Sequence, residues 1–517
     1  MISGARGKEV LAQQTKCNFP ERAEEDKGPE GMDDAELNER KSRLEDDLVL
    51  FVEEAWSVLE PGTQFQPNWH IHAIGEFLTA ARRGQIRRGI INIPPRHMKS
   101  LLTTVNFPCW IWSTEPEKRF MFASYSGNLS QDHSVLRRSL LLSEWYQELW
   151  SDRVQLASGQ NLKTQFANRR GGRMIATSVG GTATGRGGEF VIVDDPHSAQ
   201  QALSEAHRQR AIKFFDQTLT TRLNDPKTGV ILIIMQRLHE ADLTGHLLAK
   251  GGWEHLKLPA EAEERERIIF AITGEVHDRM PGEALWPERF PKQVLEEQKI
   301  SMGSYAYAGQ MQQNPAPLEG AIIKREWIKF YRELPKLDIH LQSWDCTFKE
   351  TKDSDFVVGQ VWAKAAPENP RESARYYLID QVRARMDFIA TKNALRTLSA
   401  KHPNAIAKLI EDKANGPAVI ASLKDEIDGI IAVKPEAGKQ SRLIAVSPLF
   451  EAGNIFLPDP RHAPWVHDYI QELCAFPKAA HDDQVDATSQ ALLRLRKPQA
   501  DGIYTYYQRQ VQKLSRS

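Results

Sequence analysis

The sequence predicts an α/β protein of two domains in series, the first built on a mostly parallel sheet and the second on a different order of strands. Its 517 residues exceed the length at which a single hydrophobic core is usual. Short β-rich runs alternate with helical stretches in the first half, which is typical of a parallel sheet: GIINIP, RFMFASYS, RMIATSV, EFVIVDD and GVILIIMQ. In the second half, three β-rich runs follow one another before helices return.

Composition shifts divide the chain into five segments. Residues 1–45 carry many charges and few large apolar side chains, which predicts a flexible N-terminal arm. The first domain then spans 46–313, and a proline-containing segment, 314–337, connects it to a second domain at 338–493. A basic tail with several tyrosines, 494–517, follows.

The composition is that of a soluble globular protein, with 41% apolar and 26% charged residues. No apolar run approaches the roughly 20 residues that cross a bilayer, and residues 1–30 lack the apolar core of a secretory signal. We therefore expect no membrane association and a cytosolic setting. The four cysteines form no CxxC pair, which argues against a disulfide framework and against a zinc site.

The formal net charge of -1 means that any contact with DNA must be local, because phosphate binding needs clustered lysine and arginine. Two segments offer such clusters, residues 82–88 and the tail 494–517. Taken alone, each is more simply a solvated basic face.

A phosphate-binding loop is predicted between Ile93 and Ser100, where a β-rich run gives way to a helical stretch. Lys99 would reach the β- and γ-phosphates of ATP, and the hydroxyl of Ser100 would ligate Mg²⁺. Both glycines of the GxxxxGK[ST] pattern are absent, with Ile93 and Met98 in their places. The start of the next helix would help to hold the phosphates, together with the loop residues Pro95, Arg96, His97 and Met98.

Two further strand ends carry polar groups to the same edge of the predicted sheet. The apolar run 190–193 leads directly into Asp194 and Asp195. Asp194 would hold Mg²⁺ through water, and Asp195 would polarise the attacking water. The next buried run, 230–235, ends in polar side chains at the same edge, where ligands bind in open α/β sheets: Gln236, Arg237 and His239.

Two arginines could neutralise charge on the γ-phosphate in the transition state: Arg96 in the loop, and Arg186 in the glycine-rich segment 180–188. The sequence leaves both open. The glycine-rich segment allows a close approach of phosphate or DNA, and is equally consistent with a plain loop. Upstream, Gln66 lies among aromatic residues that could meet the adenine, although a helix-initiating turn at Pro67 is the simpler structural explanation.

The order of elements in the second half suggests an RNase H-like domain. Three consecutive strands are predicted in IHLQSWDCTF, DFVVGQVWAKA and RYYLIDQVRA, followed by a helix, the strand AIAKLIED, another helix and the short strand GIIAV. Carboxylates stand at the first and fourth of these strands and at the start of a late helix: Asp345, Glu411, Asp482 and Asp483. Such a set could bridge two Mg²⁺ or Mn²⁺ ions for phosphodiester hydrolysis, with Asp355 and Asp486 as secondary candidates.

Seven segments in order resemble the motifs of the large subunit of tailed-bacteriophage terminase: PPRHMKS, FASYS, GGTATGRGGEFVIVDDP, MQRLHEADLTG, SWDCTFKETKDSDFVVGQVW, LIEDKANGPAVI and HDDQVDA. The resemblance spans roughly residues 66–493. It implies an ATPase that moves double-stranded DNA into a procapsid and a nuclease that cuts the concatemeric genome. It assigns Lys99, Ser100, Asp194 and Asp195 to the ATPase site, and residues 236–239 to the segment that couples hydrolysis to motion. Its nuclease residues are Asp345, Glu411 and Asp482 or Asp483.

The resemblance also implies partners and a location. These are a small terminase subunit, the portal protein of the procapsid and a ring of ATPase subunits, usually five. The protein would act in the host cytoplasm while docked on the portal and would be absent from the mature virion. The sequence departs from the family pattern at Met98, where glycine is frequent, and at Asp195, which stands in place of glutamate.

Two alternatives remain at this stage. A helicase-nuclease of repair or transposition would share both catalytic halves, but a second P-loop is not found between residues 240 and 314. A non-catalytic assembly scaffold would explain the missing glycines, but it leaves the carboxylates at the strand ends unexplained.

Overall fold

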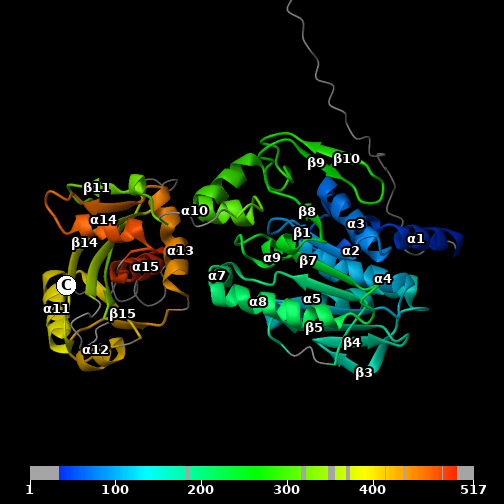
Figure 1. The fold of residues 1–517 in the computed structure, drawn as a ribbon, viewed down its shortest axis with the longest axis horizontal. Helices are drawn as coiled ribbons and strands as arrows, with labels where there is room; N and C mark the ends of the chain where they lie inside the picture. The colour runs from blue at the N-terminus through cyan, green and yellow to red at the C-terminus, as the bar shows by residue number, and fades with distance from the viewer. Residues whose placement is uncertain are drawn as a thin grey trace, which may run out of the picture.

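The structure forms two lobes, and the long helix α10 (Lys292–Gln310) lies at their junction (Figure 1). Among the described residues, no helix is both long and apolar enough to cross a bilayer. The predicted arm up to residue 33, the tail from residue 498 and Asp355 lie outside the described residues. The computed structural model describes residues 34–181, 185–315, 322–346, 356–367, 373–413, 415–435, 437–479 and 481–497.

The first lobe is built on an eight-stranded sheet in the order β3-β4-β5-β2-β6-β7-β1-β8. From β5 to β8 in this order all neighbours are parallel, and β3 and β4 add an antiparallel edge. The strands are β1 (Arg88–Asn92), β2 (Arg119–Ser124), β3 (Leu156–Leu162), β4 (Gln165–Asn168), β5 (Arg173–Ser178), β6 (Phe190–Asp194), β7 (Val230–Met235) and β8 (Glu254–Lys257). The predicted mostly parallel sheet is confirmed.

Helices cover both faces of this sheet, which explains the continuous apolar runs of its central strands. In β7, Val230, Leu232 and Ile234 enter one core, and the alternate residues enter the other. The helices over the first face are α2 (Leu48–Leu59), α3 (Trp69–Arg82), the π-helical η1 (Leu101–Asn106), α4 (Phe107–Thr114), α5 (Gly127–Leu142) and α6 (Glu144–Trp150). On the other face lie α8 (Glu205–Gln217), η2 (Leu219–Arg222) and α9 (Leu243–Lys250), and the short α7 (Ala199–Ala202) precedes α8.

Residues 34–45, predicted as part of the arm, instead form a helix that packs on the first lobe. This helix, α1 (Asp34–Asp46), buries Leu44, whose carbonyl accepts a hydrogen bond from Trp110 Nε1 at 2.9 Å. Only Leu37 and Leu44 face the core from this helix, so its apolar signal is weak in the sequence. The first domain therefore includes residues 34–45.

The second lobe holds a seven-stranded sheet in the order β11-β17-β14-β13-β12-β15-β16. The strands β12, β13 and β14 are antiparallel, and β15 and β16 continue parallel to β12, which is the order that the sequence predicts for an RNase H-like domain. The strands are β11 (Lys329–Tyr331), β12 (Ile339–Asp345), β13 (Val357–Ala365), β14 (Arg375–Ala384), β15 (Ala405–Glu411), β16 (Ile430–Val433) and β17 (Ile455–Pro458).

Two groups of helices sandwich this second sheet. One face packs against α13 (Lys439–Glu451), α14 (Val466–Ala475) and α15 (Asp483–Arg496), and the other against α11 (Phe388–Lys401) and α12 (Gly416–Leu423). The predicted connection differs in one respect: its later part forms η3 (Arg325–Trp327) and then β11, which pairs with β17. The second domain therefore begins before residue 338.

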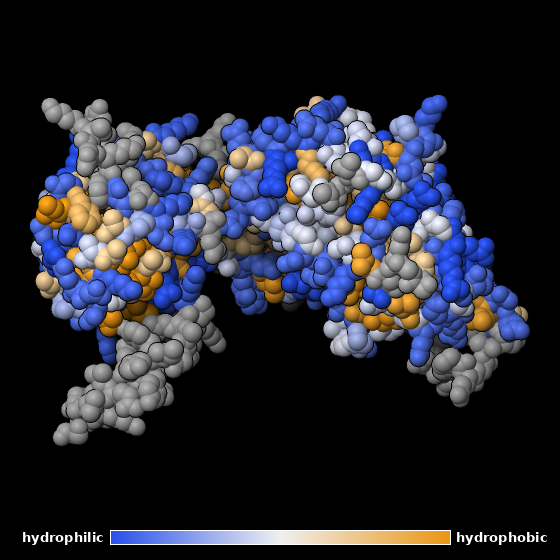
Figure 2. Space-filling view, turned by 90° about the horizontal axis from the view of Figure 1, so that it is seen from below, coloured by the Kyte–Doolittle hydropathy of each residue, from blue (hydrophilic) through white to orange (hydrophobic). Residues whose placement is uncertain are grey.

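The lobes meet where α10 (Lys292–Gln310) of the first contacts α13 of the second. Gly303 kinks α10 with a φ of 75°, and a Cβ there would lie 2.9 Å from Pro448 Cγ. The next residue, Ser304, donates its backbone N–H to Glu451 Oε2 at 3.0 Å. Seen from below, the surface is hollowed between the lobes (Figure 2), where a cavity of about 720 Å³ is lined by α7, α10 and α13.

A hairpin of β9 (Glu266–Ile269) and β10 (Val276–Arg279) lies over the first lobe and is fixed by a buried arginine. Arg279 is 0% exposed, with Nη1 2.7 Å from Glu266 Oε2 and 3.1 Å from the carbonyl of Pro259. Removing a buried cation leaves its partners unpaired. We expect Arg279→Ala to lower the free energy of unfolding by about 2–4 kcal/mol, measured by urea unfolding.

The matched control for this prediction lies on the same hairpin. Arg265 pairs with Asp278 at 3.3 Å, but both side chains are well exposed. Arg265→Ala should change the unfolding free energy by less than about 0.5 kcal/mol. Equal losses in the two variants would show that burial of Arg279 is not what stabilises the hairpin.

Candidate active sites

The loop after β1 keeps the backbone of a phosphate cradle without its glycine. Met98 stands directly before Lys99, where the P-loop pattern has glycine, and its φ of 64° lies in the left-handed region that glycine favours. Arg96 is left-handed as well, with a φ of 66°. The side chain of Met98 is 6% exposed and joins the core, so its packing offsets a backbone strain of about 1–2 kcal/mol.

Three strand ends meet around Lys99, as predicted for parallel strands. Its ammonium lies 3.0 Å from Asp195 Oδ2, just after β6, and donates a hydrogen bond to Gln236 Oε1, just after β7. Because β7 lies between β1 and β6 in the sheet, Gln236 stands between the loop and the acid.

Asp194 ends β6 and contacts the residue predicted to share Mg²⁺ with it. Its Oδ1 accepts a hydrogen bond from Ser100 Oγ at 3.1 Å, and its Oδ2 accepts one from Thr104 Oγ1 at 2.7 Å. His133 Nδ1 lies 3.5 Å from the same Oδ2. A hydroxyl beside a carboxylate is an oxygen donor set that fits Mg²⁺.

Asp195 is held in an unusual state beside this pair. Its φ is 46°, and its Oδ1 is buried without a hydrogen-bond partner among the described residues. Burial raises the pKa of Asp195 to about 6, with Asp194 adding to the rise and Lys99 opposing it. A carboxylate with a pKa near neutrality suits a group that orients water and accepts a proton.

A cavity of about 1000 Å³ opens beside Lys99, large enough for a nucleotide. Of the two predicted arginines, Arg96 lines it, whereas Arg186 is exposed and does not. His97 was predicted to help hold the phosphates, but its ring does not line the cavity. The ring is buried, with its centroid 4.4 Å from that of Phe290. The predicted residues that do line it are Gln66, Pro95, Arg96, Met98, Lys99, Ser100, Asp195 and Gln236.

The cavity has further walls that the sequence did not indicate. Trp56 of α2 lines it, and so do Trp286 and Arg289 of an irregular segment that follows β10. The Arg289 guanidinium lies 5.2 Å from the Trp286 ring, which places another cation beside the loop. These residues lie far from the phosphate loop in sequence and follow no recognisable spacing, so only the fold brings them together.

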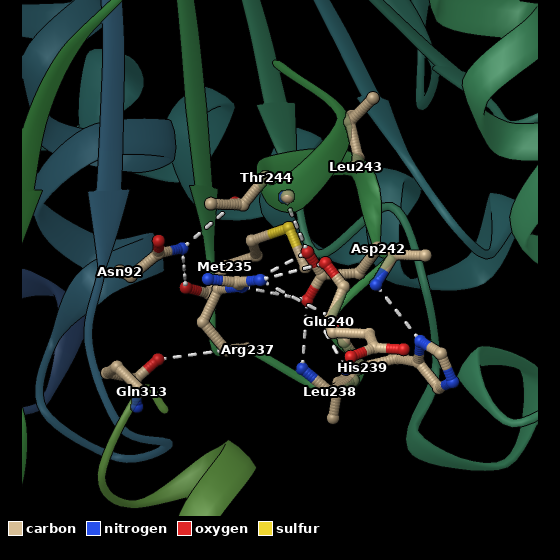
Figure 3. A network of polar contacts seen from close by, with 12 residues as sticks. Asn92, Met235, Arg237, Leu238, His239, Glu240, Asp242, Leu243, Thr244 and Gln313 are labelled. Atoms are coloured by element: carbon tan, nitrogen blue, oxygen red, sulfur yellow. Dashed lines mark hydrogen bonds and ion pairs between the residues drawn. The ribbon is translucent and has the colours of Figure 1, made fainter. Parts of the chain in front are cut away.

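The turn after β7 is closed by an ion pair between Arg237 and Asp242 (Figure 3). Arg237 Nε lies 3.0 Å from Asp242 Oδ2. Asp242 is fully buried, and it accepts the N–H groups of Leu238 at 3.0 Å and of Gly245 at 2.9 Å, so it also caps α9. His239, which was predicted to be a coupling residue, lies in the same turn. Its Nδ1 accepts a hydrogen bond from the backbone N–H of Ala241 at 3.0 Å.

Two hydrogen bonds tie this turn to other parts of the lobe. The N–H of Leu243 donates to His197 Nε2 at 3.1 Å, and His197 follows Asp195 by two residues. The N–H of Arg237 donates to Gln313 Oε1 at 2.9 Å. Gln313 lies just beyond α10, so the turn is connected to the nucleotide cavity on one side and to the interdomain helix on the other.

In the second lobe, the predicted metal ligands converge on neighbouring elements. Asp345 ends β12, Glu411 ends the adjacent parallel strand β15, Asp482 directly precedes α15, and Asp483 begins it. Gln490 of α15 donates hydrogen bonds to residues of both strands, which fixes the helix across them.

The centre of this cluster carries buried negative charge. Asp345 is 4% exposed and Asp483 is 3% exposed. Burial raises the pKa of Asp483 to about 7, and the carboxylates of Asp345 and Glu472 add to the rise. A cation between such groups would be stabilising. Glu472, on α14, was not predicted from the sequence.

Two cations of α13 already contact the cluster. Lys439 Nζ lies 2.7 Å from Asp482 Oδ1 and 2.5 Å from Asp486 Oδ2. Arg442 lies 2.7 Å from Asp486 and 3.5 Å from Glu411. Although burial opposes it, the carboxylates of Asp486 and Asp482 raise the pKa of Lys439 above its usual value. The secondary candidate Asp486 is therefore held by two basic side chains.

The donor set fits a hard divalent cation in its chemistry, since such ions prefer carboxylate oxygens. In the described residues no three acidic, histidine or cysteine side chains stand in metal-binding geometry. Instead, the guanidinium of Arg442 lies 3.5 Å from the carboxylate of Glu411. A divalent ion held by Asp345, Glu411 and Asp483 would replace that guanidinium.

The predicted basic cluster at 82–88 is largely engaged within the first lobe. Arg82 pairs with Glu115 at 2.9 Å and lies 4.3 Å from the Trp110 ring. Arg88 donates to the carbonyl of Gly229 at 2.8 Å. These contacts favour a structural role over DNA binding.

Buried histidines next to the phosphate loop give the first lobe a pH-dependent stability. Burial lowers the pKa of His97 to about 4 and that of His70 well below its usual range. Both are neutral when folded but bind protons near pH 6.5 when unfolded. Their stabilising contribution is therefore complete above pH 6.5 and is lost as the pH falls towards 4.

We expect the thermal unfolding temperature to drop between pH 7.5 and pH 5, and His97→Phe to reduce that drop. The phenyl ring can keep the stacking on Phe290 but cannot titrate. His207→Gln, at an exposed position, is the control and should leave the drop unchanged. A drop that is the same in His97→Phe as in the parent protein would contradict this account.

Comparisons with known proteins found similarities that cover both lobes. Residues 342–495 match the family model described as the terminase RNaseH-like domain. The chain is similar to the solved structure of a large terminase from a thermophilic bacteriophage, with 12% identity, a TM-score of 0.52 and coverage of 82% of this chain and 98% of that chain. No curated protein sequence matches.

Two other solved structures align less closely. The HK97 bacteriophage large terminase shares 10% identity over 87% of this chain and 98% of that chain, with a TM-score of 0.37. The nuclease of the large terminase from thermophilic phage G20c, with bound magnesium, shares 13% identity over 34% of this chain and 99% of that chain, with a TM-score of 0.25. Residues 342–495 thus match the model of the terminase RNaseH-like domain family, and the chain as a whole has a fold similar to that of a bacteriophage large terminase.

Proposed function

We propose that this protein is a viral DNA-packaging motor, in which ATP hydrolysis by the first lobe drives double-stranded DNA into a procapsid and the second lobe cuts the concatemeric genome. The observation that carries the proposal is the pairing of two sites in one chain. Lys99, Asp195 and Gln236 meet at a nucleotide-sized cavity, and buried carboxylates meet in a terminase RNaseH-like domain.

In the ATPase site, Lys99 would bind the phosphates, and Ser100 and Asp194 would hold the magnesium ion. Magnesium, when bound, neutralises charge that develops on the phosphates. Asp195 orients the attacking water and accepts its proton, which its raised pKa of about 6 favours. Arg96 or Arg289, each on the cavity wall, neutralises the γ-phosphate.

Coupling starts at Gln236, because phosphate and Gln236 compete for the ammonium of Lys99. Nucleotide that draws Lys99 away frees Gln236, and the adjoining turn held by Arg237 and Asp242 then shifts. The shift reaches α10 through the hydrogen bond to Gln313. From α10 it passes to α13 of the second lobe through Ser304 and Glu451.

This route predicts that Gln313→Ala separates hydrolysis from movement. Basal ATP hydrolysis should stay within about twofold, and the DNA moved per ATP should fall about 5–10-fold. Gln310→Ala, one turn earlier on α10, is the matched control. Movement per ATP that is unchanged in Gln313→Ala would exclude this route.

In the nuclease site, Asp345, Glu411 and Asp483 would hold two Mg²⁺ or Mn²⁺ ions, with Asp482 at the rim. Divalent ions in such a site activate water and stabilise the leaving oxygen. The chain's own contribution is to hold these carboxylates together and to bury them, which the raised pKa of Asp483 supports.

The partners and location of the proposal follow from the resemblance to large terminases. The protein would act with a small terminase subunit and the portal protein, as a pentameric ring docked on the procapsid in the host cytoplasm, and would leave before the virion matures.

A translocase and a helicase can be told apart directly. The proposal predicts that the protein, with ATP, displaces a third strand from a triplex on double-stranded DNA but does not unwind the duplex. Among the described residues, 240–313 form α9, β8, the β9–β10 hairpin and α10 but no second sheet of the ATPase type, which supports this expectation. Duplex unwinding would favour the helicase-nuclease alternative. ATP hydrolysis at the background level, with no displacement, would favour a scaffold.

A further inference from the structure

We propose that Thr104 is a positioning residue of the ATPase site, which holds the carboxylate of Asp194 in the orientation that shares magnesium with Ser100. The inference rests on the proposed ATPase function and adds a residue that neither the sequence motifs nor the family resemblance assigns. A chain of buried contacts carries it, from Asp194 through Thr104 to Arg137 of α5.

Thr104 reaches Asp194 because it follows Ser100 by about one helical turn. Residues four apart on a helix face the same side, so both hydroxyls meet one carboxylate. Ser100 Oγ donates to Oδ1 at 3.1 Å, and Thr104 Oγ1 donates to Oδ2 at 2.7 Å. Thr104 and Asp194 are each 2% exposed. A hydrogen bond to one oxygen of a metal-binding carboxylate orients the whole group, which leaves Oδ1 on the side of the phosphate loop.

An unusual stretch of helix places Thr104. Residues Leu101–Asn106 form the π-helix η1, a form that is rare and that is often found at functional sites. Pro108, four residues after Thr104, has no N–H to donate to the Thr104 carbonyl in α-helical geometry. Arg137 Nη1 donates to this carbonyl at 2.8 Å. The position of Thr104 is therefore set by a contact from outside its own helix.

Arg137 is a cation buried next to this contact. Its side chain is 0% exposed, and its guanidinium lies 3.6 Å from the Phe122 ring of β2. Burying a cation is costly, and burial lowers the pKa of Arg137 to about 9, whereas the charge of Asp194 opposes that shift. The buried cation and the buried carboxylate therefore stabilise each other across Thr104.

The helix α5 approaches the same carboxylate a second time. His133, one turn before Arg137, has its Nδ1 3.5 Å from Asp194 Oδ2, and it lines the nucleotide cavity. Oδ2 is thus contacted from both η1 and α5. A purely structural role for Thr104 would satisfy Oδ2 equally with and without magnesium. A positioning role matters for the nucleotide that carries the ion.

The test compares nucleotide binding with and without Mg²⁺, which separates positioning from folding. Full-length protein carrying Thr104→Val, which keeps the branched shape and removes the hydroxyl, is titrated with fluorescent ADP in Mg²⁺ and in EDTA. Affinity in EDTA should be unchanged, because the variant keeps the loop and Lys99. Affinity in Mg²⁺ should fall about 10-fold, because removing the hydrogen-bond partner of a metal ligand weakens metal binding. The Mg²⁺ concentration for half-maximal ATP hydrolysis should rise by a similar factor.

Three companion variants sharpen the result. Thr104→Ser keeps the hydroxyl and should restore the affinity in Mg²⁺. Thr79→Val removes a hydroxyl of α3 that donates to the Gly75 carbonyl at 2.8 Å, and should change neither affinity. Arg137→Lys keeps the charge but loses the guanidinium, and should weaken binding in Mg²⁺ about 2–5-fold. Added to Thr104→Val, it should contribute little further loss, since both act through one carboxylate.

The outcomes separate this inference from the proposed function. If the parent protein hydrolyses ATP but Thr104→Val keeps the parent's ratio of affinities in Mg²⁺ and EDTA, the inference is wrong and the ATPase assignment stands. Equal losses in Mg²⁺ and EDTA would overturn it as well, because they would show a structural role. If the parent protein binds no nucleotide, the inference and the proposed ATPase both fail. A loss confined to Mg²⁺ and restored by Thr104→Ser supports the inference.

Discussion

Asp345→Asn should abolish metal-dependent cutting of DNA, by about a thousandfold or more, and leave ATP hydrolysis unchanged. Asparagine keeps the shape of the buried side chain at the end of β12 but removes the charge that a divalent ion needs. The variant should also bind Mn²⁺ more weakly in calorimetry. This second measurement separates loss of a ligand from loss of an unrelated catalytic role.

The control for this variant is Asp425→Asn, an exposed carboxylate beyond α12 in the same lobe. It should cut DNA as the wild type does. Undiminished cutting by Asp345→Asn would remove this residue, and with it the proposed centre, from the nuclease mechanism.

Lys99→Ala should reduce ATP hydrolysis to background, a loss of about a thousandfold or more, because a fixed cation at the phosphates stabilises charge that grows in the transition state. The side chain is 7% exposed, and its ammonium is held beside the cavity by Asp195 and Gln236 until phosphate competes with Gln236 for it. Steady-state phosphate release measures the effect, and fluorescent ATP binding shows whether affinity is lost as well.

Lys213→Ala, at an exposed position on α8, is the control for charge removal in the same lobe. DNA cutting with Mn²⁺ should persist in Lys99→Ala, because the nuclease acids lie in the other lobe. If Lys99→Ala hydrolyses ATP as fast as the control, the loop after β1 is not the nucleotide site.

The central strands of both sheets could be predicted from sequence because they carry strong local signals, whereas β3, β4, β8, β11 and β17 were not predicted. The run from Val230 to Met235 is apolar throughout because each side chain faces one of two cores, and a parallel strand covered on both faces has that pattern. The three successive strands of the second lobe likewise preceded their helices in the predicted order. The helix at 34–45 was not predicted because it buries so few apolar residues.

The sites were predicted less completely, for reasons of geometry. Lys99, Asp194 and Asp195 stand at strand ends, where sequence position alone places them at the same edge of the sheet. Trp286 and Arg289 reach the cavity from an irregular segment and leave no periodic signal. The missing glycine at position 98 weakened the prediction, yet the left-handed φ of its methionine preserves the loop.

The carboxylate cluster of the second lobe was also predicted incompletely. Lys439 and Arg442 lie on α13, and nothing in their spacing indicates that they reach acids at the start of α15. Glu472 lies on the amphipathic α14 and meets the site only because that helix packs against α15. Contacts between helices that are distant in sequence depend on how the sheet and its layers pack, which local patterns do not encode.

The central claim is that one chain carries a nucleotide-driven motor and a separate metal-dependent nuclease. The most direct test incubates wild type, Lys99→Ala and Asp345→Asn with plasmid, ATP and Mn²⁺, and measures phosphate release and DNA cutting in the same tubes. The account predicts that wild type does both, that Lys99→Ala only cuts, and that Asp345→Asn only hydrolyses ATP. Hydrolysis and cutting that survive in all three proteins would contradict it.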